Sequence, residues 1–206
     1  SITDDNYGLT VFEQTAPDVY VIFDKLSITL STPDDRIDVG STATVNYVVT
    51  RQYDGSASSA SITLNDTLTK NVVGKYGYTV SSVSGDEYGI TAFDANSISI
   101  IFDRVQITLS AVDNRINVGD TAEYTYAAIY EYDGADAADY VTLTLNDTLT
   151  KNTVGKYGYT VSSISESQYG LTAFASNTFY IIFDKLSVVF SASDLNPLID
   201  TKVTIS

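Results

Sequence analysis

The sequence predicts an all-β protein made of repeated β-sandwich modules, each with about seven strands and about 80 residues. Three observations lead to this prediction. One stretch rich in β-branched and aromatic residues occurs three times, as Val19–Leu30, Ile98–Leu109 and Phe179–Phe190. Turn-forming Asp and Gly residues separate short alternating segments, and no useful window has the period of an amphipathic helix. Asp far outnumbers Glu, which favours turns over helices.

Each copy of the repeated stretch carries an Asp-Lys or Asp-Arg pair in its middle and contains no Gly or Pro. Its length exceeds the usual strand of about 5–6 residues, so each copy predicts two strands that meet at the charged pair. The last strand of one module is therefore expected to run into the first strand of the next with almost no linker.

Within the first full repeat, the alternation and the turn residues place the other strands. The expected strands span residues 26–31, 42–53, 60–64, 67–70, 75–82, 88–93 and 98–102. A polar turn occupies residues 33–40, and Asp54-Gly55 marks another turn.

Four tyrosines alternate along the 75–82 strand and its counterpart, so they point to one face; they are Tyr76, Tyr78, Tyr157 and Tyr159. We interpret them as core or inter-sheet residues. The alternative is an exposed aromatic ladder for glycan stacking or subunit contact.

The internal repeats set the expected domain boundaries. Phe23 recurs at Phe102 and Phe183, and residues 64–82 recur as 145–163 with one change, Val72 to Thr153. We expect full modules at residues 23–102 and 103–183. Residues 1–22 resemble the C-terminal strands of an incomplete repeat, and residues 184–206 the N-terminal strands of a further one. A permuted frame that begins near Tyr7 also fits the period.

Two interpretations of the terminal segments stay open. The chain is a window on a longer tandem array, or its terminal strands are exchanged with neighbouring subunits and build a filament.

The motifs VG-(S/D)-TA, YDG, LND, GKYGYTVSS, YG-(I/L)-TAF and IIFD follow one another in the same order in the repeats. This order resembles the tandem immunoglobulin-like repeats of prokaryotic surface proteins, such as the invasin-type bacterial modules and the repeats of long secreted archaeal proteins. The resemblance implies an Ig-like sandwich at a cell surface. In that fold Tyr7, Tyr88 and Tyr169 lie where a tyrosine corner would be; a plain edge aromatic is the equal alternative.

Composition narrows the function classes. The chain has no Cys, and therefore no disulfide framework, and it has no His, the commonest general base and transition-metal ligand. A net charge of −15 opposes binding to nucleic acid. No apolar run reaches about 18 residues, so no membrane span is expected, and the N-terminal residues show no signal-peptide pattern.

Asn65 and Asn146 each begin an Asn-Asp-Thr sequon at the end of a predicted strand, in equivalent places of the two full repeats. They are candidate sites for N-linked glycans, in keeping with an exported protein. The alternative is that Asn-Asp only forms a turn.

Acidic turns offer oxygen ligands for calcium, although their spacing matches no EF-hand loop and turn Asp and Asn residues are common without metal. The three clusters are Asp34, Asp35 and Asp38; Asp113, Asn114, Asn117 and Asp120; and Asp194, Asn196 and Asp200. No metal or other cofactor is part of the main interpretation.

Some surface Ig-like modules join their first and last strands by a Lys–Asn isopeptide bond. The candidate residues here are Lys25, Lys185, Asn96 and Asn177, with Lys70, Lys75, Lys151 and Lys156 as donors in less suitable positions. Arg104 replaces the lysine in the second repeat and cannot form the bond. The alternative is a surface Asp–Lys or Asp–Arg pair worth ~0–1 kcal/mol.

An enzyme is not expected, because a small repeated unit with no glycine-rich phosphate loop, catalytic triad or zinc spacing does not assemble one catalytic constellation. The sequence predicts an extracellular structural protein that forms an acidic rod or filament from tandem sandwiches, with self-association or a longer array. The alternative is an adhesin stalk or carbohydrate-binding surface module.

Overall fold

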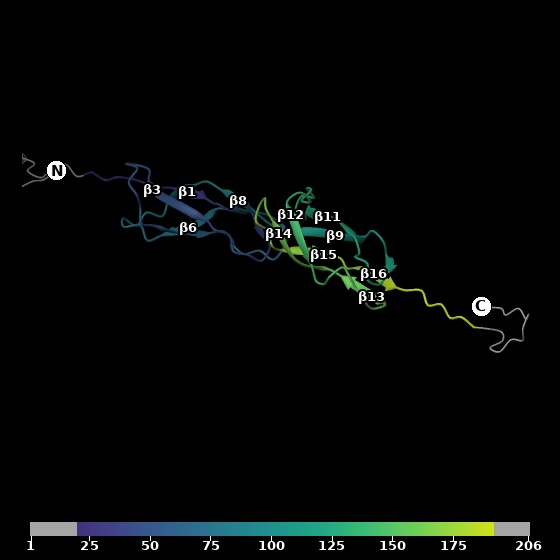
Figure 1. Cartoon of the computed structure of the whole chain (residues 1–206). Helices are drawn as coiled ribbons and strands as arrows, with labels where there is room; N and C mark the ends of the chain where they lie inside the picture. The colour runs from purple at the N-terminus through teal and green to yellow at the C-terminus, as the bar shows by residue number, and fades with distance from the viewer. Residues whose placement is uncertain (1–19, 192–206) are drawn as a thin grey trace, which may run out of the picture. The chain divides into compact units, whose positions relative to one another are not determined.

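The computed structural model describes residues 20–191 (Figure 1). In this part of the chain there are sixteen strands and no helix, which confirms the all-β prediction. None of the described residues therefore forms a helix long and apolar enough to cross a membrane. The predicted terminal strands lie largely in residues 1–19 and 192–206, outside the described part.

Eight strands belong to the first sequence repeat: β1 (Leu26–Ser31), β2 (Arg36–Asp38), β3 (Asn46–Arg51), β4 (Ser61–Leu64), β5 (Gly74–Tyr78), β6 (Val80–Ser84), β7 (Phe93–Ala95) and β8 (Ile98–Asp103). Eight belong to the second: β9 (Val105–Ala111), β10 (Arg115–Asn117), β11 (Tyr124–Tyr130), β12 (Val141–Leu145), β13 (Gly155–Tyr159), β14 (Val161–Glu166), β15 (Phe174–Ser176) and β16 (Phe179–Asp184).

The two sets of strands pair in the same order. Sheets β3-β1-β7, β2-β8-β5 and β4-β6 recur as β11-β9-β15, β10-β16-β13 and β12-β14. In both sets the short strand pairs are parallel, β1 with β7 and β2 with β8, then β9 with β15 and β10 with β16.

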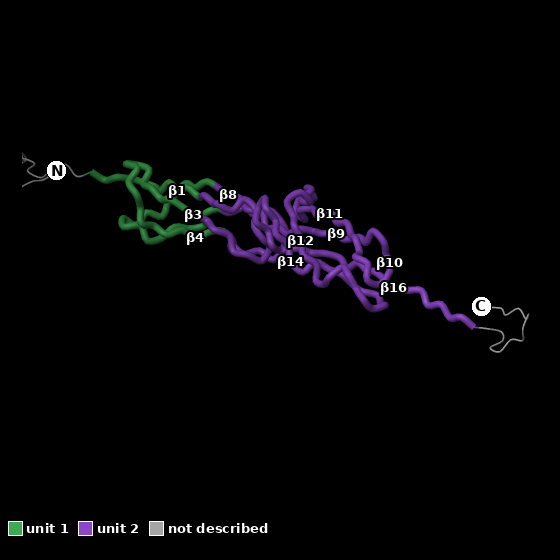
Figure 2. Tube along the Cα trace, viewed as in Figure 1, with its two compact units in different colours: residues 1–30, 47–65, 79–96 green, residues 31–46, 66–78, 97–206 purple. Residues whose placement is uncertain are grey.

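The chain divides into two compact units (Figure 2). Unit 1 contains described residues 20–30, 47–65 and 79–96, with the sheets β3-β1-β7 and β4-β6. Unit 2 contains residues 31–46, 66–78 and 97–191, and so holds sheet β2-β8-β5 together with the whole second repeat. These units do not follow the repeat boundaries at 23–102 and 103–183, which stay predictions.

The second repeat is a sandwich around one apolar core inside unit 2. Val105 and Ile107 from β9, Tyr159 from β13 and Ile181 and Phe183 from β16 are all fully buried in this core. Alternation along β9 and β16 sends every second side chain inward, as expected for half-buried strands. Unit 1 has its own buried residues on the same pattern, with Leu26, Ile28 and Leu30 from β1.

The expected meeting of two strands at the charged pair is confirmed for Ile98–Leu109. Strand β8 ends at Asp103 and β9 begins at Val105, so Arg104 alone separates them. In the other two copies the prediction is wrong within the described residues, because only one strand forms in each, β1 after Lys25 and β16 before Lys185, and residues 20–24 and 186–190 belong to no strand.

The single strand expected over residues 75–82 is wrong, because the chain divides it into β5 and β6 at Thr79. Asn65 holds Thr79 with two hydrogen bonds: its Oδ1 accepts from the Thr79 N–H at 2.9 Å, and its own N–H donates to the Thr79 carbonyl at 3.0 Å. Strand β5 then pairs with β8, and β6 with β4.

Four other segments differ from expectation. Residues 42–53 form a strand only from Asn46, and residues 67–70 make only an isolated bridge, Thr42 to Thr69. The turn at residues 33–40 contains β2, which the sequence pattern did not predict. The 88–93 segment is a turn until Phe93, because Asp86 accepts bonds from the N–H groups of Tyr88 and Ile90 and Gly89 has a φ of 72°.

Candidate functional site: an arginine junction in unit 2

A buried arginine from the first repeat enters the second repeat within unit 2. Arg36 begins β2, and its side chain is only 6% exposed. Its Nη2 donates to Asp133 Oδ2 at 2.5 Å, and its Nη1 lies 3.3 Å from Oδ2 of the fully buried Asp103. The guanidinium is therefore held between one carboxylate at the end of β8 and another in the turn after β11.

Three tyrosine rings surround the same guanidinium. Its central carbon lies 4.8 Å from the ring centroid of Tyr130, 4.7 Å from that of Tyr169 and 5.9 Å from that of Tyr132. Aromatic faces attract a cation at these distances, more strongly where water is excluded. We call these three rings, with Asp103 and Asp133, the arginine socket of the second repeat.

Local hydrogen bonds fix the socket. Asp103 Oδ1 accepts from the N–H groups of Arg104, at 2.8 Å, and Tyr132, at 2.9 Å, so it ties the strand junction to the turn after β11. The Tyr130 hydroxyl donates to Glu166 at 2.9 Å, and the Tyr130 and Tyr169 rings meet edge to face at 5.3 Å. The positions of these groups are thus set by the backbone.

The electrostatics suit a permanently charged arginine. Burial acts to lower the pKa of Arg36, but the hydrogen bond and charge of Asp133 outweigh it and leave that pKa raised. The hydrogen bond from Arg36 lowers the pKa of Asp133. Burial raises the pKa of Asp103, since its two backbone hydrogen bonds and the Arg36 charge do not fully offset the loss of water.

A second contact lies on the same strand as Arg36. Asp38, at the end of β2, accepts hydrogen bonds from the Thr172 N–H at 2.9 Å, the Thr172 hydroxyl at 2.6 Å and the Ala173 N–H at 2.9 Å. The next residue, Val39, donates its N–H to the Asp103 carbonyl at 2.8 Å. The Asp38 side chain therefore binds β2 to the second repeat, while the Val39 N–H binds it to the end of β8.

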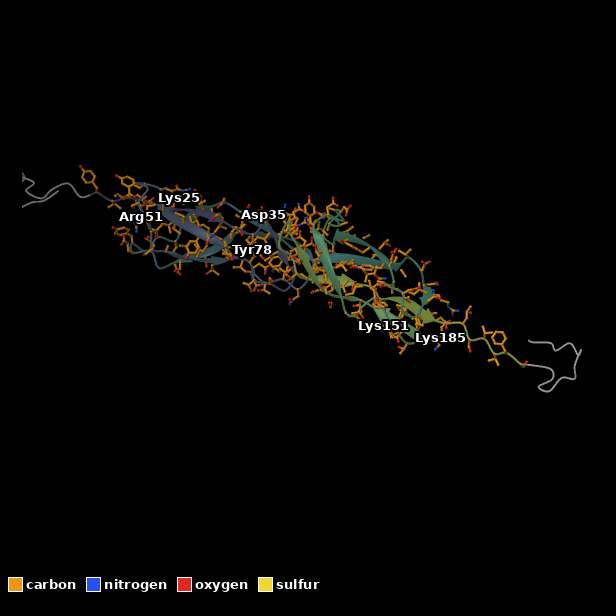
Figure 3. All side chains as sticks on the ribbon, viewed as in Figure 1. Lys25, Asp35, Arg51, Tyr78, Lys151 and Lys185 are labelled. Carbon is orange, nitrogen blue, oxygen red and sulfur yellow. The ribbon has the colours of Figure 1, made fainter. Side chains whose placement is uncertain are left out.

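Unit 1 has a related cluster with a different centre. Arg51 stands where the second repeat has Tyr130, and its Nη2 donates to Asp86 at 3.1 Å and Glu87 at 2.8 Å. The Arg51 guanidinium lies 4.6 Å from the Tyr88 ring centroid. Figure 3 shows Arg51 near Lys25, at the end of unit 1 where the chain enters.

The two candidate glycosylation residues lie in equivalent exposed positions, directly after β4 and β12. Asn65 Oδ1 accepts from Thr79, and Asn146 Oδ1 accepts from the Thr160 N–H at 2.9 Å. The carbonyl of each side chain thus has a structural use, and an N-linked glycan keeps that carbonyl.

The acidic residues of the two described calcium clusters are not gathered around a common point. Asp34 accepts from the Thr44 N–H at 2.7 Å, Asp38 binds Thr172, and Asp120 accepts from Asn117 at 3.0 Å. Within residues 20–191, no group of three or more acidic side chains is placed to hold a metal ion. The cluster of Asp194, Asn196 and Asp200 lies outside the described residues.

Lys25 and both asparagines considered for an isopeptide bond have separate partners. Lys25 forms an ion pair with Asp94. Asn96 binds the Leu30 main chain through both its Oδ1 and Nδ2, and Asn177 binds Leu109 in the same way. These asparagines thus join the end of each first strand to the loop before the last strand by hydrogen bonds.

Core packing of the alternating tyrosines is confirmed. Tyr78 and Tyr159 are fully buried, while Tyr76 and Tyr157 are half-buried and each meet a core phenylalanine edge to face at 5.6 Å, Phe102 and Phe183 respectively.

Tyr88 and Tyr169 do not form tyrosine corners. Their rings pack on Arg51 and Arg36, and the Tyr169 hydroxyl accepts from the Gln168 side chain at 3.1 Å rather than bonding to main chain. Tyr7 lies outside the described residues.

Sequence reasoning missed Arg36 and Asp38, which carry the junction. A signal was present: an arginine occupies the equivalent positions 36 and 115 of both repeats, in an acidic turn that was interpreted only as a turn or calcium cluster. The pattern did not show which residues the arginine contacts, because these residues lie in the following repeat.

No family model matches the sequence, and no curated protein matches it. The solved structures that are similar to it include two bacterial proteins. The D0-D1 domain of intimin is 14% identical with a TM-score of 0.25, over 76% of this chain and 97% of that one. InvD of Yersinia pseudotuberculosis is 13% identical with a TM-score of 0.26, over 82% of this chain and 62% of that one, less than two thirds of its length.

Proposed function

We propose that the chain is an extracellular structural protein in which tandem β-sandwich modules, at residues 23–102 and 103–183, form a stiff rod or filament. The observation that carries this proposal is the arginine junction. Arg36 is buried against carboxylates and rings of the following repeat, and Arg104 alone separates β8 from β9.

The junction supports stiffness through its energetics. Bending between the modules would draw Arg36 away from Asp133 and leave buried charges without partners, which is strongly unfavourable. It would also break the three hydrogen bonds of Asp38. A rod that resists bending is therefore the mechanical function that these contacts serve.

Self-association of the chain is part of the proposal, through exchanged terminal strands or a longer array. Large apolar side chains are exposed at the start of the first module and just after the second: Phe23 is 94% exposed and Leu186 is 96% exposed. Both belong to copies of the stretch that forms β8 and β9 at the centre of the chain. In a polymer these segments would gain the partners that β8 and β9 have.

Electron microscopy of the purified chain tests the proposal. We expect filaments, and we expect deletion of residues 1–22 to leave separate particles. Unchanged assembly after that deletion would exclude exchange of the N-terminal strands, and globular monomers under all conditions would exclude a filament.

N-linked glycans at Asn65 and Asn146 belong to the same proposal, because an acidic, glycosylated exterior keeps a long array soluble. Mass spectrometry of the protein from its own cells should show glycan on both residues. If the peptide that contains one of these residues is fully unmodified, that residue is not a glycosylation site.

A second candidate function is an adhesin stalk or carbohydrate-binding surface module. It is favoured by Tyr53 and Tyr88, two exposed rings that line one pocket with Asp24 and Asp54. Aromatic faces beside carboxylates are typical of sugar sites. Binding on a glycan array, lost on replacing either ring with Ala, would favour this candidate over the purely structural one.

A further inference from the structure

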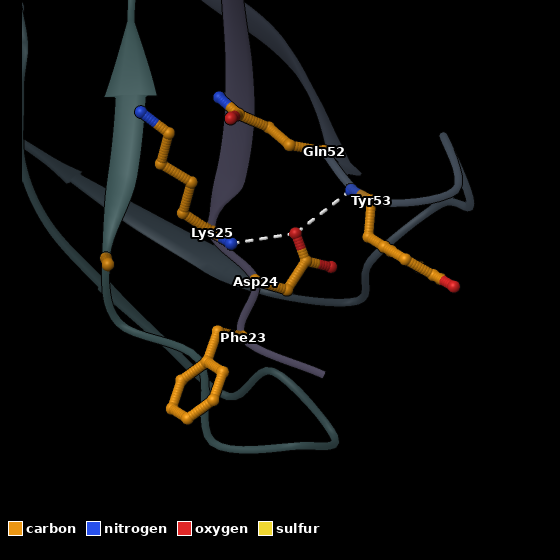
Figure 4. A pocket seen from close by; sticks show the side chains of 6 residues that line it. Phe23, Asp24, Lys25, Gln52 and Tyr53 are labelled. Carbon is orange, nitrogen blue, oxygen red and sulfur yellow. Dashed lines mark hydrogen bonds between the residues drawn. The ribbon is translucent and has the colours of Figure 1, made fainter. Parts of the chain in front are cut away.

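Unit 1 contains counterparts of most groups of the arginine socket. Asp24 Oδ1 accepts from the N–H groups of Lys25, at 2.8 Å, and Tyr53, at 3.0 Å (Figure 4). These are the same two bonds that Asp103 Oδ1 makes with Arg104 and Tyr132 in unit 2. The backbone thus places Asp24 and Tyr53 as it places the corresponding socket residues of the second repeat.

The remaining socket groups also have counterparts. Asp54 corresponds to Asp133: its Oδ1 accepts from the Ser56 N–H at 2.9 Å, as Asp133 Oδ1 accepts from the Ala135 N–H at 3.1 Å. The other carboxylate oxygen of Asp133, Oδ2, accepts the hydrogen bond from Arg36. Tyr88 corresponds to Tyr169, and its ring is 73% exposed.

These groups line a real pocket of about 390 Å³ on unit 1, together with Ile22, Arg51 and Ile90. We call it the outer socket. Arg51 is a cation inside it, but Arg51 is paired with Asp86 and Glu87. With Asp24 and Asp54, carboxylates outnumber cations in the outer socket, which therefore attracts a further cation.

The complementary arginine lies at the end of the second repeat. Arg115 begins β10 as Arg36 begins β2, and its Nη1 lies 3.5 Å from Asp184, as Arg36 Nη1 lies 3.3 Å from Asp103. Unlike Arg36, however, its side chain is 64% exposed. Lys156 and Lys185 line the two pockets that Arg115 also lines, so this surface is basic.

We propose that Arg115 of one copy of this chain binds in the outer socket of a second copy, between Asp54 and the rings of Tyr53 and Tyr88. This proposal rests on the proposed function and deepens it, because it names the contact that joins one chain to the next. In the internal junction, Asp103 lies beside Arg36 and also accepts a hydrogen bond from the Tyr132 N–H. Between copies two residues divide these roles: Asp184 lies beside Arg115, and Asp24 accepts from the Tyr53 N–H.

The joint between copies is weaker than the internal one. Asn117 takes the place of Asp38, and its amide already donates to Asp120 at 3.0 Å. A neutral amide accepts fewer and weaker hydrogen bonds than a carboxylate. Arg51 in place of Tyr130 also puts a second cation near the incoming one. Reversible, salt-sensitive association is thus expected.

Sedimentation equilibrium of the full chain tests the proposal with two variants that each damage one half of the contact. Arg115→Glu removes the arginine, while Asp54→Asn removes the socket charge but keeps the Oδ1 acceptor for Ser56. Circular dichroism checks that both are folded, and Lys75→Glu is the control, since Lys75 is an exposed cation that lines neither the outer socket nor the pockets beside Arg115.

At low salt the unsubstituted chain and Lys75→Glu should form oligomers that grow with concentration, and about 0.5 M salt should reduce them. Each contact variant alone should associate about tenfold more weakly or stay monomeric. An equimolar mixture of the two variants should give heterodimers and nothing larger. The Asp54→Asn chain still has its Arg115, and the Arg115→Glu chain still has its outer socket, so each pair of chains can form one contact only.

An unsubstituted chain that stays monomeric, or an Arg115→Glu variant that associates normally, would overturn the proposal. The two proposals fail in different ways. Normal association of Arg115→Glu removes this contact and leaves the filament intact, a chain that stays monomeric removes both, and loose coupling inside unit 2 of a single chain removes the stiff rod alone.

Discussion

Arg36 and Asp133 lie 97 residues apart in the sequence, yet they form a hydrogen-bonded ion pair of 2.5 Å inside unit 2. The pair joins the second strand of the first repeat to a turn of the second. Because Arg36 is almost fully buried, its charge depends on the carboxylates that it meets there. The junction and the core beside it can be tested by substitution.

Arg36→Ala should lower the free energy of unfolding by about 3 kcal/mol, since removal of one member of a buried ion pair leaves Asp103 without a counter-charge. Chemical denaturation monitored by tyrosine fluorescence measures the change. The matched control is Arg115→Ala, which removes the equivalent but mostly exposed arginine and should cost less than about 1 kcal/mol. Equal losses for the two variants would contradict the role given to Arg36.

Asp38→Ala should increase hydrogen exchange at the Thr172 and Ala173 amides, because both N–H groups donate to the Asp38 carboxylate. The increase should be confined to that segment, which is a sign of local opening. Asn117→Ala, the equivalent change in the second repeat, should leave these amides as they are. Unchanged exchange in Asp38→Ala would show that this contact does not hold the junction.

Replacement of two equivalent core tyrosines by Phe should have different effects. The Tyr78 hydroxyl donates to the Thr67 carbonyl at 3.2 Å, whereas the buried Tyr159 hydroxyl has no hydrogen-bond partner within the described residues. Tyr78→Phe should therefore cost about 1 kcal/mol, and Tyr159→Phe should be neutral or slightly stabilising. Thermal unfolding of the two variants measures both changes in stability. A larger loss of stability in Tyr159→Phe than in Tyr78→Phe would contradict the prediction.

Acid should destabilise the protein. The pKa of Asp133 is lowered by its bond from Arg36, and the pKa of Glu166 is lowered because three backbone N–H groups outweigh its burial. A carboxylate whose folded pKa is depressed contributes stability above its unfolded pKa and loses it as the pH falls through the folded value. The ordinary values are 3.8 for Asp and 4.5 for Glu.

The melting temperature should therefore fall from about pH 5 downward. Asp103 acts in the opposite direction, because its raised pKa favours the protonated folded form as the pH falls. Asp133→Asn should melt lower than the unsubstituted chain at pH 7 and lose less between pH 7 and pH 3. If the melting temperatures of the two proteins fall in parallel as the pH is lowered, Asp133 is not a source of the acid sensitivity.

The sequence was informative wherever local composition decided the structure. Apolar alternation was sufficient for β1 and β8, and the Asp-Arg pair marked the break between β8 and β9. It was misleading at Thr79, since the alternation continues through the point where Asn65 divides the strand. A side chain distant in sequence decided that boundary, and periodicity carries no information about it.

The candidate site was predictable only in part. The repeated turns that contain Asp54 and Asp133 were evident, and so was the tyrosine that starts each YG motif. Their common use as a socket required the fold, because it depends on Arg36 from the preceding repeat. The rings were expected either at a tyrosine corner or as plain edge aromatics, and in the structure they pack on guanidinium groups.

The central claim is that Arg36 fixes sheet β2-β8-β5 of the first repeat rigidly to the second repeat within unit 2. The distribution of distances between two spin labels, one on each repeat, tests this claim most directly. The chain has no cysteine, so spin labels can be attached cleanly at Lys75→Cys on β5 and Thr142→Cys on β12, both exposed and both in unit 2. Electron–electron double resonance should give one narrow distance in the otherwise unsubstituted chain and a clearly broader distribution when Arg36→Ala is added. A distribution that is already broad with Arg36 present, or one that Arg36→Ala leaves narrow, would contradict the claim.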